Sequence, residues 1–187
     1  MIKIAIFGGS FDPPHQGHQR IVEKALDVLE IDKLIIIPTF LNPFKNSSLA
    51  TAAMRLSWCH KLFDQYPRVE VSDYEISLNK PVYTSESLRH FQELYDVKYL
   101  IIGADNLSSI EKWHSFEWLN QEVSWVVAHR RDHPLETEML RDWLPLDISV
   151  DVSSTDIRAD IKDGKELRYI DEKIVTEVAS IIENNKK

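Results

Sequence analysis

The sequence predicts an α/β protein with a Rossmann-like, doubly wound and mainly parallel sheet of about six strands and flanking helices. Short apolar runs alternate with helix-type patterns along most of the chain, which is typical of strands joined by crossover helices. The first apolar run ends in a glycine-containing turn that leads into a helical pattern. No repeat, low-complexity segment or linker divides the 187 residues, so a single domain over residues 1–187 is expected.

Six strands are expected where apolar residues are nearly continuous, as they are in strands covered on both faces. The run KLIII at residues 33–37 is the clearest example. The expected strands are 2–7, 33–37, 68–72, 98–102, 124–128 and 147–152.

Helices are expected where apolar residues recur three or four positions apart. In the first helix this period is carried by Ile21, Val22, Ala25, Leu26 and Leu29. The expected helices are 17–29, 50–66, 83–95, a short helix before the aromatic stretch 113–119, 135–143, a helix opened by SSTDIR, and 171–183. Residues 75–81 are expected to be irregular, and Gly164 is expected to follow the end of the SSTDIR helix as its C′ residue.

Composition narrows the class of protein. A net charge of −8 argues against a broad surface for nucleic acid or anionic membranes. No apolar run approaches the ~20 residues of a membrane span, and no secretory signal precedes the first strand. The single cysteine, Cys59, excludes an internal disulfide and is expected in the core. We therefore expect a cytoplasmic protein with neither nucleic-acid nor membrane partners.

The segment GGSFDPPHQGH, residues 8–18, follows the first strand and holds three of the five glycines. Gly8 and Gly9 have no side chains to keep a phosphate away from main-chain N–H groups. His15 and His18 lie three positions apart at the start of the next helix, so both can face one ligand. The segment therefore predicts an anion site.

Unusual residues follow four of the expected strands, in the segments GGSFDPPHQGH, IIGAD, AHRR and VSSTDIR. The carboxyl ends of parallel strands meet at one edge of a sheet, so these segments are expected to lie together. With the loop after the second strand, they supply as cations or hydrogen-bond donors His15, His18, Lys45, Arg130, Arg131 and Arg158. In an acidic protein, this set predicts a local site for a polyphosphate.

Plain structural interpretations stay open for the polar residues at these strand ends. Ser153 or Ser154 could cap a helix, with Asp156 completing a capping box. Asp105 could cap the helix after the fourth strand instead of accepting from sugar hydroxyls. Arg158 could be a solvated surface residue, although a cation in a first helical turn opposes the helix dipole.

The histidine pair and Trp113 also have alternatives. His15 and His18 could ligate a transition metal, but the prolines at 13–14 and Gly17 disfavour the regular helix that such a pair needs. Trp113 could be a core or edge aromatic instead of a stacking platform. The opening segment is neither a Walker loop nor G-x-G-x-x-G, and no spacing suggests a covalent nucleophile.

The opening segment, with its H-x-G-H core, resembles the nucleotidyltransferase superfamily of adenylyl- and cytidylyltransferases. VSSTDIR, YTSESL and IIGAD with a later KW narrow the resemblance to bacterial nicotinate-nucleotide adenylyltransferases, over essentially the whole chain. The resemblance implies one nucleotidyltransferase domain that uses ATP and nicotinate mononucleotide. The implied products, formed in NAD biosynthesis, are nicotinate adenine dinucleotide and pyrophosphate, with Mg²⁺ bound through substrate phosphates and not by protein ligands.

The resemblance also implies roles for individual residues. Those expected in catalysis are His15, His18, Lys45 and Arg158. Those expected to bind ATP are Gly8, Gly9, Ser10, Phe11, His15, His18, Gly103, Asp105, Ser154, Thr155 and Arg158. Those expected to bind the mononucleotide are Thr84, Trp113, His114 and Arg130. The mononucleotide phosphate is already an anion, so its attack on the α-phosphorus of ATP needs no protein nucleophile or general base.

Three positions depart from the pattern usual in that family. NPFK stands where PPHK is usual, which places Phe44 beside Lys45. His114 stands where tyrosine is usual, and Arg130-Arg131-Asp132 where RPG is usual. Two alternatives remain: an adenylyltransferase for nicotinamide mononucleotide or phosphopantetheine, and a nucleotide-binding sensor without turnover. The sequence leaves the oligomeric state open, a homo-oligomer included.

Overall fold

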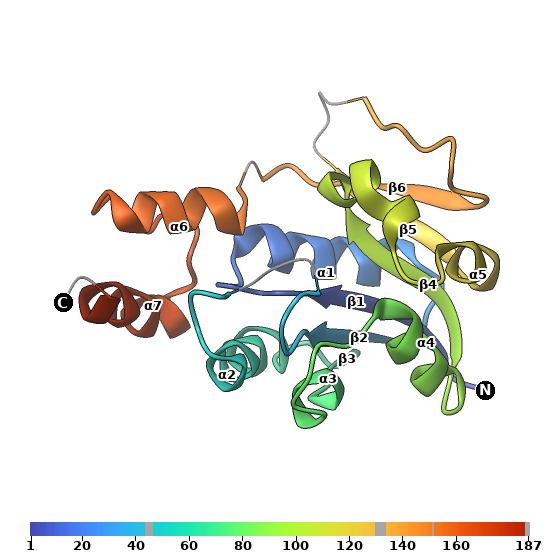
Figure 1. Cartoon of the computed structure of the whole chain (residues 1–187), viewed down its shortest axis with the longest axis horizontal. Helices are drawn as coiled ribbons and strands as arrows, with labels where there is room; N and C mark the ends of the chain where they lie inside the picture. Colours follow the sequence, from blue (N-terminus) through green and yellow to red (C-terminus); the bar gives the residue numbers. More distant parts are fainter. Residues whose placement is uncertain (44–46, 130–133, 151, 186–187) are drawn as a thin grey trace.

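The computed structural model describes residues 1–43, 47–129, 134–150 and 152–185, and the sheet within them has six strands, all parallel (Figure 1). The strand order is β3-β2-β1-β4-β5-β6. The chain moves outward from β1 to β3 and restarts beside β1 at β4, so the sheet is doubly wound as expected. The strands are β1 Lys3–Gly9, β2 Lys33–Pro38, β3 Val69–Val71, β4 Asp96–Gly103, β5 Ser124–His129 and β6 Trp143–Asp147.

The central strands are apolar on both faces because helices cover both sides of the sheet. Along β1, Ala5 and Phe7 enter one core cluster, whereas Ile4 and Ile6 enter the other. Strand β2 alternates in the same way, and its residues 34–37 are almost fully buried. This period of two produces two hydrophobic cores, one on each face.

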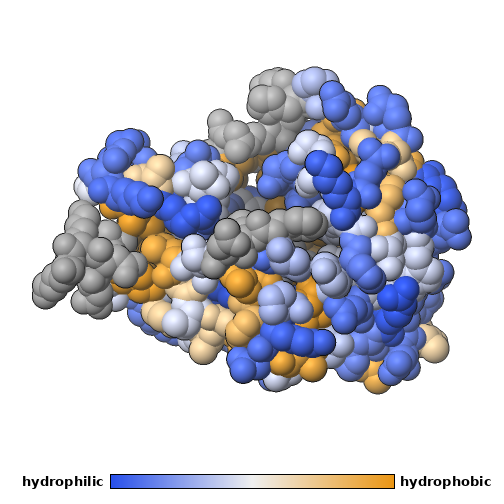
Figure 2. Space-filling model, in the orientation of Figure 1, coloured by the Kyte–Doolittle hydropathy of each residue, from blue (hydrophilic) through white to orange (hydrophobic). Residues whose placement is uncertain are grey.

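The helices divide between these two faces (Figure 1). One face is covered by α1 Gln16–Val28, α2 Ala52–Phe63, α6 Ser154–Lys162 and α7 Glu172–Asn185. The other is covered by α3 Tyr74–Ser77, α4 Thr84–Gln92, the 3₁₀ helix η1 Ala104–Lys112 and α5 Phe116–Glu122. In the view of Figure 2, hydrophilic residues dominate over α4 and α5, and apolar residues gather where α6 and α7 approach each other.

The sequence-based assignment is wrong for residues 135–152. No helix forms at 135–143, and the sixth strand is Trp143–Asp147, which shares only Asp147 with the expected strand 147–152. Leu140 is buried although it lies outside any helix. Asn120 hydrogen-bonds to the main-chain groups of Met139 and Arg141, on either side of Leu140, and so holds this segment in an irregular conformation. Strand β6 lies at the sheet edge, where Pro145 is tolerated because a missing N–H there breaks no ladder.

Smaller features follow the sequence more closely. Residues 75–81 are irregular as expected only from residue 78 on, because residues 75–77 belong to the one-turn helix α3. Gly164 follows the cap of α6 with a φ of +69°, which confirms its C′ role, since a left-handed conformation costs glycine little. Cys59 is fully buried, as expected, and burial raises its pKa far above the usual value for a thiol. Within the described residues, no helix has both the length and the apolar character needed to span a membrane.

Candidate active site

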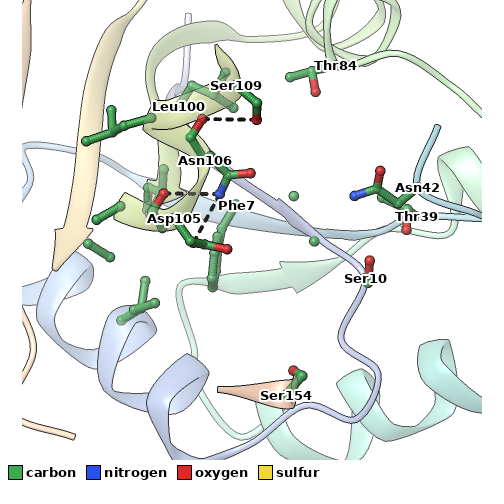
Figure 3. A pocket seen from close by; sticks show the side chains of 18 of the residues that line it. Phe7, Ser10, Thr39, Asn42, Thr84, Leu100, Asp105, Asn106, Ser109 and Ser154 are labelled. Atoms are coloured by element: carbon green, nitrogen blue, oxygen red, sulfur yellow. Dashed lines mark hydrogen bonds between the residues drawn. The ribbon is translucent and has the colours of Figure 1, made fainter. Parts of the chain in front are cut away.

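A cavity of about 1280 Å³ lies at the carboxyl edge of the sheet, where β1, β2, β4 and β5 end. Figure 3 shows Ser10, Thr39 and Asn42 on one side of the opening, Asp105 and Asn106 on the other, and Ser154 at the far end. The segments that follow the strands therefore come together here, as the topology predicts.

The first wall is the loop after β1, which wraps around the ring of Phe11. Phe11 is almost fully buried and has a positive φ of 47°. A Cβ at Gly9 would lie 3.2 Å from that ring, so Gly9 allows Phe11 to fold back under the loop. A Cβ at Gly8 would contact nothing closer than 3.9 Å, because the space beside Gly8 belongs to the cavity.

The two histidines of the opening segment form an unusual capping box at the start of α1. His15 is the N-cap residue, and its Nδ1 accepts the main-chain N–H of Gly17 at 3.1 Å. His18, three residues on, accepts the main-chain N–H of His15 through its own Nδ1 at 3.2 Å. A Cβ at residue 17 would lie 2.9 Å from the His15 ring, so this arrangement requires Gly17.

These contacts determine the protonation of both rings. A main-chain N–H can only donate, so each Nδ1 must be an acceptor, and a neutral ring then carries its proton on Nε2. Burial lowers the pKa of His15 to about 4, against a smaller opposing effect of Asp156. Burial, aided by His15, lowers the pKa of His18 well below its usual value. At neutral pH the pair therefore offers two Nε2–H donors and no positive charge.

The start of α6 forms the next wall. Ser153 is its N-cap and accepts the main-chain N–H of Asp156, so the capping interpretation holds for Ser153 but not for Ser154. Ser154 lines the cavity and donates to the carbonyl of Pro13. Arg158 donates to the carbonyl of Asp12 at 2.8 Å and to Thr155 Oγ1 at 3.1 Å. Arg158 is thus fixed at the cavity instead of being a free surface residue.

The segment after β4 places polar groups opposite the loop after β1 (Figure 3). Asn106 donates to the carbonyl of Gly103 at 3.1 Å and contacts Asp105 Oδ1 at 3.4 Å. Helix η1 has Gly103 at its N-cap and no side-chain cap bond, so the capping interpretation of Asp105 is wrong. Asp105 is exposed at the cavity, where its carboxylate can accept from hydroxyl groups.

Another part of the cavity is aromatic. Trp113 is half-buried, with its ring edge-on to Trp125 at 6.3 Å between centroids, and it also lines the cavity. The ring of His114 stacks on Tyr83 at 4.5 Å, and its Nδ1 lies 3.0 Å from Ser85 Oγ. Thr84 lies between Tyr83 and Ser85 in the sequence. It is the first residue of α4 and also lines the cavity.

Four residues singled out from the sequence lie outside the described residues: Lys45, Phe44, Arg130 and Arg131. Their sequence neighbours Pro43 and His129 line the cavity. Sequence reasoning missed Asn42, Asn106 and Tyr83. The first two are polar residues in segments that follow strands, which is the signal that could have found them; the pairing of Tyr83 with His114 has no counterpart in the sequence pattern.

Together, the fold and the site define an α/β protein with a doubly wound parallel sheet and a polar cavity at its carboxyl edge, which is the place where open parallel sheets bind their ligands. Residues 6–160 match the family model described as cytidylyltransferase-like, and the chain belongs to that family.

Several relatives are similar over almost the full length. A Sulfurovum sp. protein named as a probable nicotinate-nucleotide adenylyltransferase is 55% identical over 185 residues, which cover 99% of this chain and 96% of the relative. A Campylobacter fetus protein with the same name is 48% identical over 86% of this chain and 87% of its own length. Among solved structures, the nicotinic acid mononucleotide adenylyltransferase of Plasmodium falciparum complexed with NaAD has a TM-score of 0.81 at 18% identity, covering 100% of this chain and 97% of that one. That similarity supports the Rossmann-like fold.

Proposed function

We propose that this chain transfers the adenylyl group of ATP to nicotinate mononucleotide, forming nicotinate adenine dinucleotide and pyrophosphate in NAD biosynthesis. One observation carries the proposal: the neutral histidine pair, the start of α6 and the Thr84–Trp113 region all line the same cavity. A site that joins two nucleotides needs room for both, with phosphate donors beside the place where they meet. The names of the full-length relatives support the choice of acceptor.

The reaction is a displacement at the α-phosphorus of ATP. An oxygen of the mononucleotide 5′-phosphate forms a bond to that phosphorus, and the bond from the α-phosphorus to the oxygen bridging it to the β-phosphorus breaks. The electron pair leaves with pyrophosphate. The attacking oxygen is already anionic, so the protein supplies positioning and charge stabilisation, of which positioning can contribute on the order of 7–11 kcal/mol.

The phosphates of ATP lie against the donors of the first wall and of α6. His15 and His18 donate through Nε2–H, with His18 nearer to the reacting phosphorus, as the family resemblance implies. Because both rings are neutral, they can donate hydrogen bonds to the phosphates without carrying a positive charge that the phosphates would already neutralise in the ground state. Arg158 donates its remaining N–H groups, and Ser154 and Thr155 lie at the positive end of the α6 dipole. From the sequence alone, Lys45 is assigned to the phosphates and Arg130 to the mononucleotide.

The remaining ATP contacts come from two segments. The loop formed by Gly8, Gly9, Ser10 and Phe11 lies along the nucleotide, with space beside Gly8 for a close approach. The segment with Gly103 and Asp105 receives the ribose, because an exposed carboxylate accepts from both sugar hydroxyls.

The acceptor ring lies on Trp113, near Thr84 and His114. Thr84 is the first residue of α4, and the first N–H groups of a helix have no acceptor within the helix. Main-chain N–H groups only donate, so they bind a carboxylate well and leave the NH₂ of an amide facing other donors. This favours nicotinate over nicotinamide, since unpaired buried polar groups discriminate strongly between ligands.

Mg²⁺ is proposed to enter with ATP. Within the described residues, no group of three or more His, Cys, Asp or Glu side chains could hold a metal ion. Mg²⁺ favours phosphate oxygens and water, so the substrate phosphates suit it as ligands. When bound there it would neutralise phosphate charge, while His15, His18 and Arg158 hold the phosphates from the protein side.

The proposal is tested by giving the purified protein ATP and Mg²⁺ with one of three acceptors: nicotinate mononucleotide, nicotinamide mononucleotide or phosphopantetheine. Pyrophosphate release is followed. We expect the highest kcat/KM with nicotinate mononucleotide and one dinucleotide formed per pyrophosphate. A preference for either other acceptor would overturn the substrate assignment. ATP binding without turnover on any acceptor would instead identify a sensor.

A further inference from the structure

Arg55, in α2, carries a buried positive charge next to the cavity without lining it. Only 1% of its surface is exposed. Burying a cation is costly unless hydrogen bonds compensate it. Here the compensation comes from main-chain carbonyls, since the side-chain hydrogen bonds of Arg55 within the described residues all end on carbonyl oxygens.

These carbonyls belong to the two loops that follow β1 and β2. Nη1 donates to the carbonyl of Ser10 at 2.6 Å and to that of Thr39 at 2.8 Å. Nη2 donates to the carbonyl of Phe40 at 2.6 Å. One planar guanidinium therefore holds Ser10, in the first loop, at a fixed separation from Thr39 and Phe40, in the second.

Asp12 completes this connection from the first loop. Its Oδ2 accepts the main-chain N–H of Leu49 at 2.7 Å, and its Oδ1 accepts that of Ala50 at 2.9 Å. Arg55 Nε reaches the carbonyl of Ala50 at 3.4 Å. The second loop is thus tied to the first loop both where it leaves β2 and where it approaches α2.

The two connected loops line the same side of the cavity opening. Ser10, in the loop assigned to ATP, and Thr39 and Asn42, in the second loop, lie across the cavity opening from Asp105 (Figure 3). A displacement at phosphorus requires the two substrates to be aligned, and a misplacement of about 1 Å can lower the rate 10²-fold. The separation of these loops therefore affects turnover more directly than the affinity for either substrate.

We infer that Arg55 is a positioning residue for adenylyl transfer: its guanidinium, with the Asp12 carboxylate, sets the separation of the two loops that together form this side of the cavity. This inference rests on the proposed function. Lysine in its place keeps the charge but replaces a rigid planar fork by one flexible ammonium group, so it cannot hold the three carbonyls in the same geometry.

The test compares Arg55→Lys with a matched control, Arg68→Lys. Arg68 donates to the carbonyls of Ile31 and Leu26, near the amino end of β2 and away from the cavity. At a temperature where circular dichroism shows both variants folded, we expect Arg55→Lys to lower kcat at least tenfold. KM for ATP and for nicotinate mononucleotide should change less than threefold. Arg68→Lys should keep all three constants within twofold of the unmodified protein.

A purely structural role for Arg55 would lower the melting temperature and leave kcat near its original value, and that result would overturn the inference. A kcat loss matched by Arg68→Lys would also overturn it. If Arg55→Lys does not fold, Asp12→Asn tests the same connection, because an amide offers only one acceptor oxygen to the two N–H groups. An unchanged kcat in Asp12→Asn would then contradict the inference. Lack of activity in the unmodified protein would contradict the proposed function instead.

Discussion

The imidazole of His15 lies stacked on that of His18, with 3.8 Å between ring centroids and an angle of 28° between the planes. Two imidazolium ions at this distance would repel each other strongly. The main-chain N–H groups that each Nδ1 accepts also favour the neutral rings. The sequence predicted that these residues are either cations or hydrogen-bond donors. Their contacts in the structure favour neutral hydrogen-bond donors. Positive charge for the phosphates of the proposed substrates must then come from other residues, such as Arg158, which also lines the cavity.

Replacing His18 by alanine removes one of the two Nε2–H donors. We expect kcat to fall at least a hundredfold, since one preorganised donor contributes about 3 kcal/mol to transition-state stabilisation. Steady-state kinetics checks this, and circular dichroism checks that the fold persists. Near-normal turnover in a folded His18→Ala protein would contradict the assigned role.

The low pKa of His15 predicts a specific loss of stability in acid. Its pKa is about 4 in the folded chain and about 6.5 when unfolded. Between these values the unfolded state binds a proton that the folded state does not, so stability falls as the pH drops from 6.5 to 4. At pH 7 both states are mostly neutral at this site, so the effect is small. The full effect is roughly 3 kcal/mol.

Urea unfolding at pH 7, 5.5 and 4.5 measures this dependence. The glutamine in His15→Gln does not titrate. As the pH is lowered over the same range, the free energy of unfolding of this variant should therefore fall less steeply than that of the unmodified protein. Parallel curves for the two proteins would show that His15 does not titrate in this way.

Truncating Trp113 to alanine should weaken binding of the acceptor. Stacking of a base-like ring on an aromatic side chain contributes about 1–3 kcal/mol, so we expect KM for nicotinate mononucleotide to rise roughly five- to hundredfold. KM for ATP should change little. Trp118→Ala is the matched control, because Trp118 packs against the same core cluster but contacts Arg89 and does not line the cavity. A change confined to KM for ATP would place Trp113 on the other substrate.

Much of the fold could be predicted because the central strands are apolar on both faces. Runs such as residues 33–37 fit a strand between two helical layers, and parallel strands bring their carboxyl ends to one edge. The predicted position of the edge strand β6 was wrong because only Leu146 in this strand is buried, and Pro145 interrupts its hydrophobic pattern. An edge strand makes fewer contacts, so its sequence carries less information.

Residues of the candidate site could be predicted from the sequence where they lie in segments that directly follow a strand. His15, Asp105 and Arg158 were found in this way, and all three line the cavity. Arg55 was not found, because it lies within a helix and reaches the loops only after α2 packs beneath them. The protonation of His15 likewise depends on a main-chain N–H two residues away, which only the folded geometry reveals.

In the proposed reaction, the adenylyl group passes directly from ATP to the acceptor phosphate without a covalent bond to the protein. The most direct test uses ATP made chiral at the α-phosphorus by sulfur substitution, with nicotinate mononucleotide as acceptor. A single in-line displacement predicts inversion of configuration at that phosphorus in the dinucleotide. Retention would require two displacements through an adenylylated side chain, with His18 the first candidate, and would contradict direct transfer.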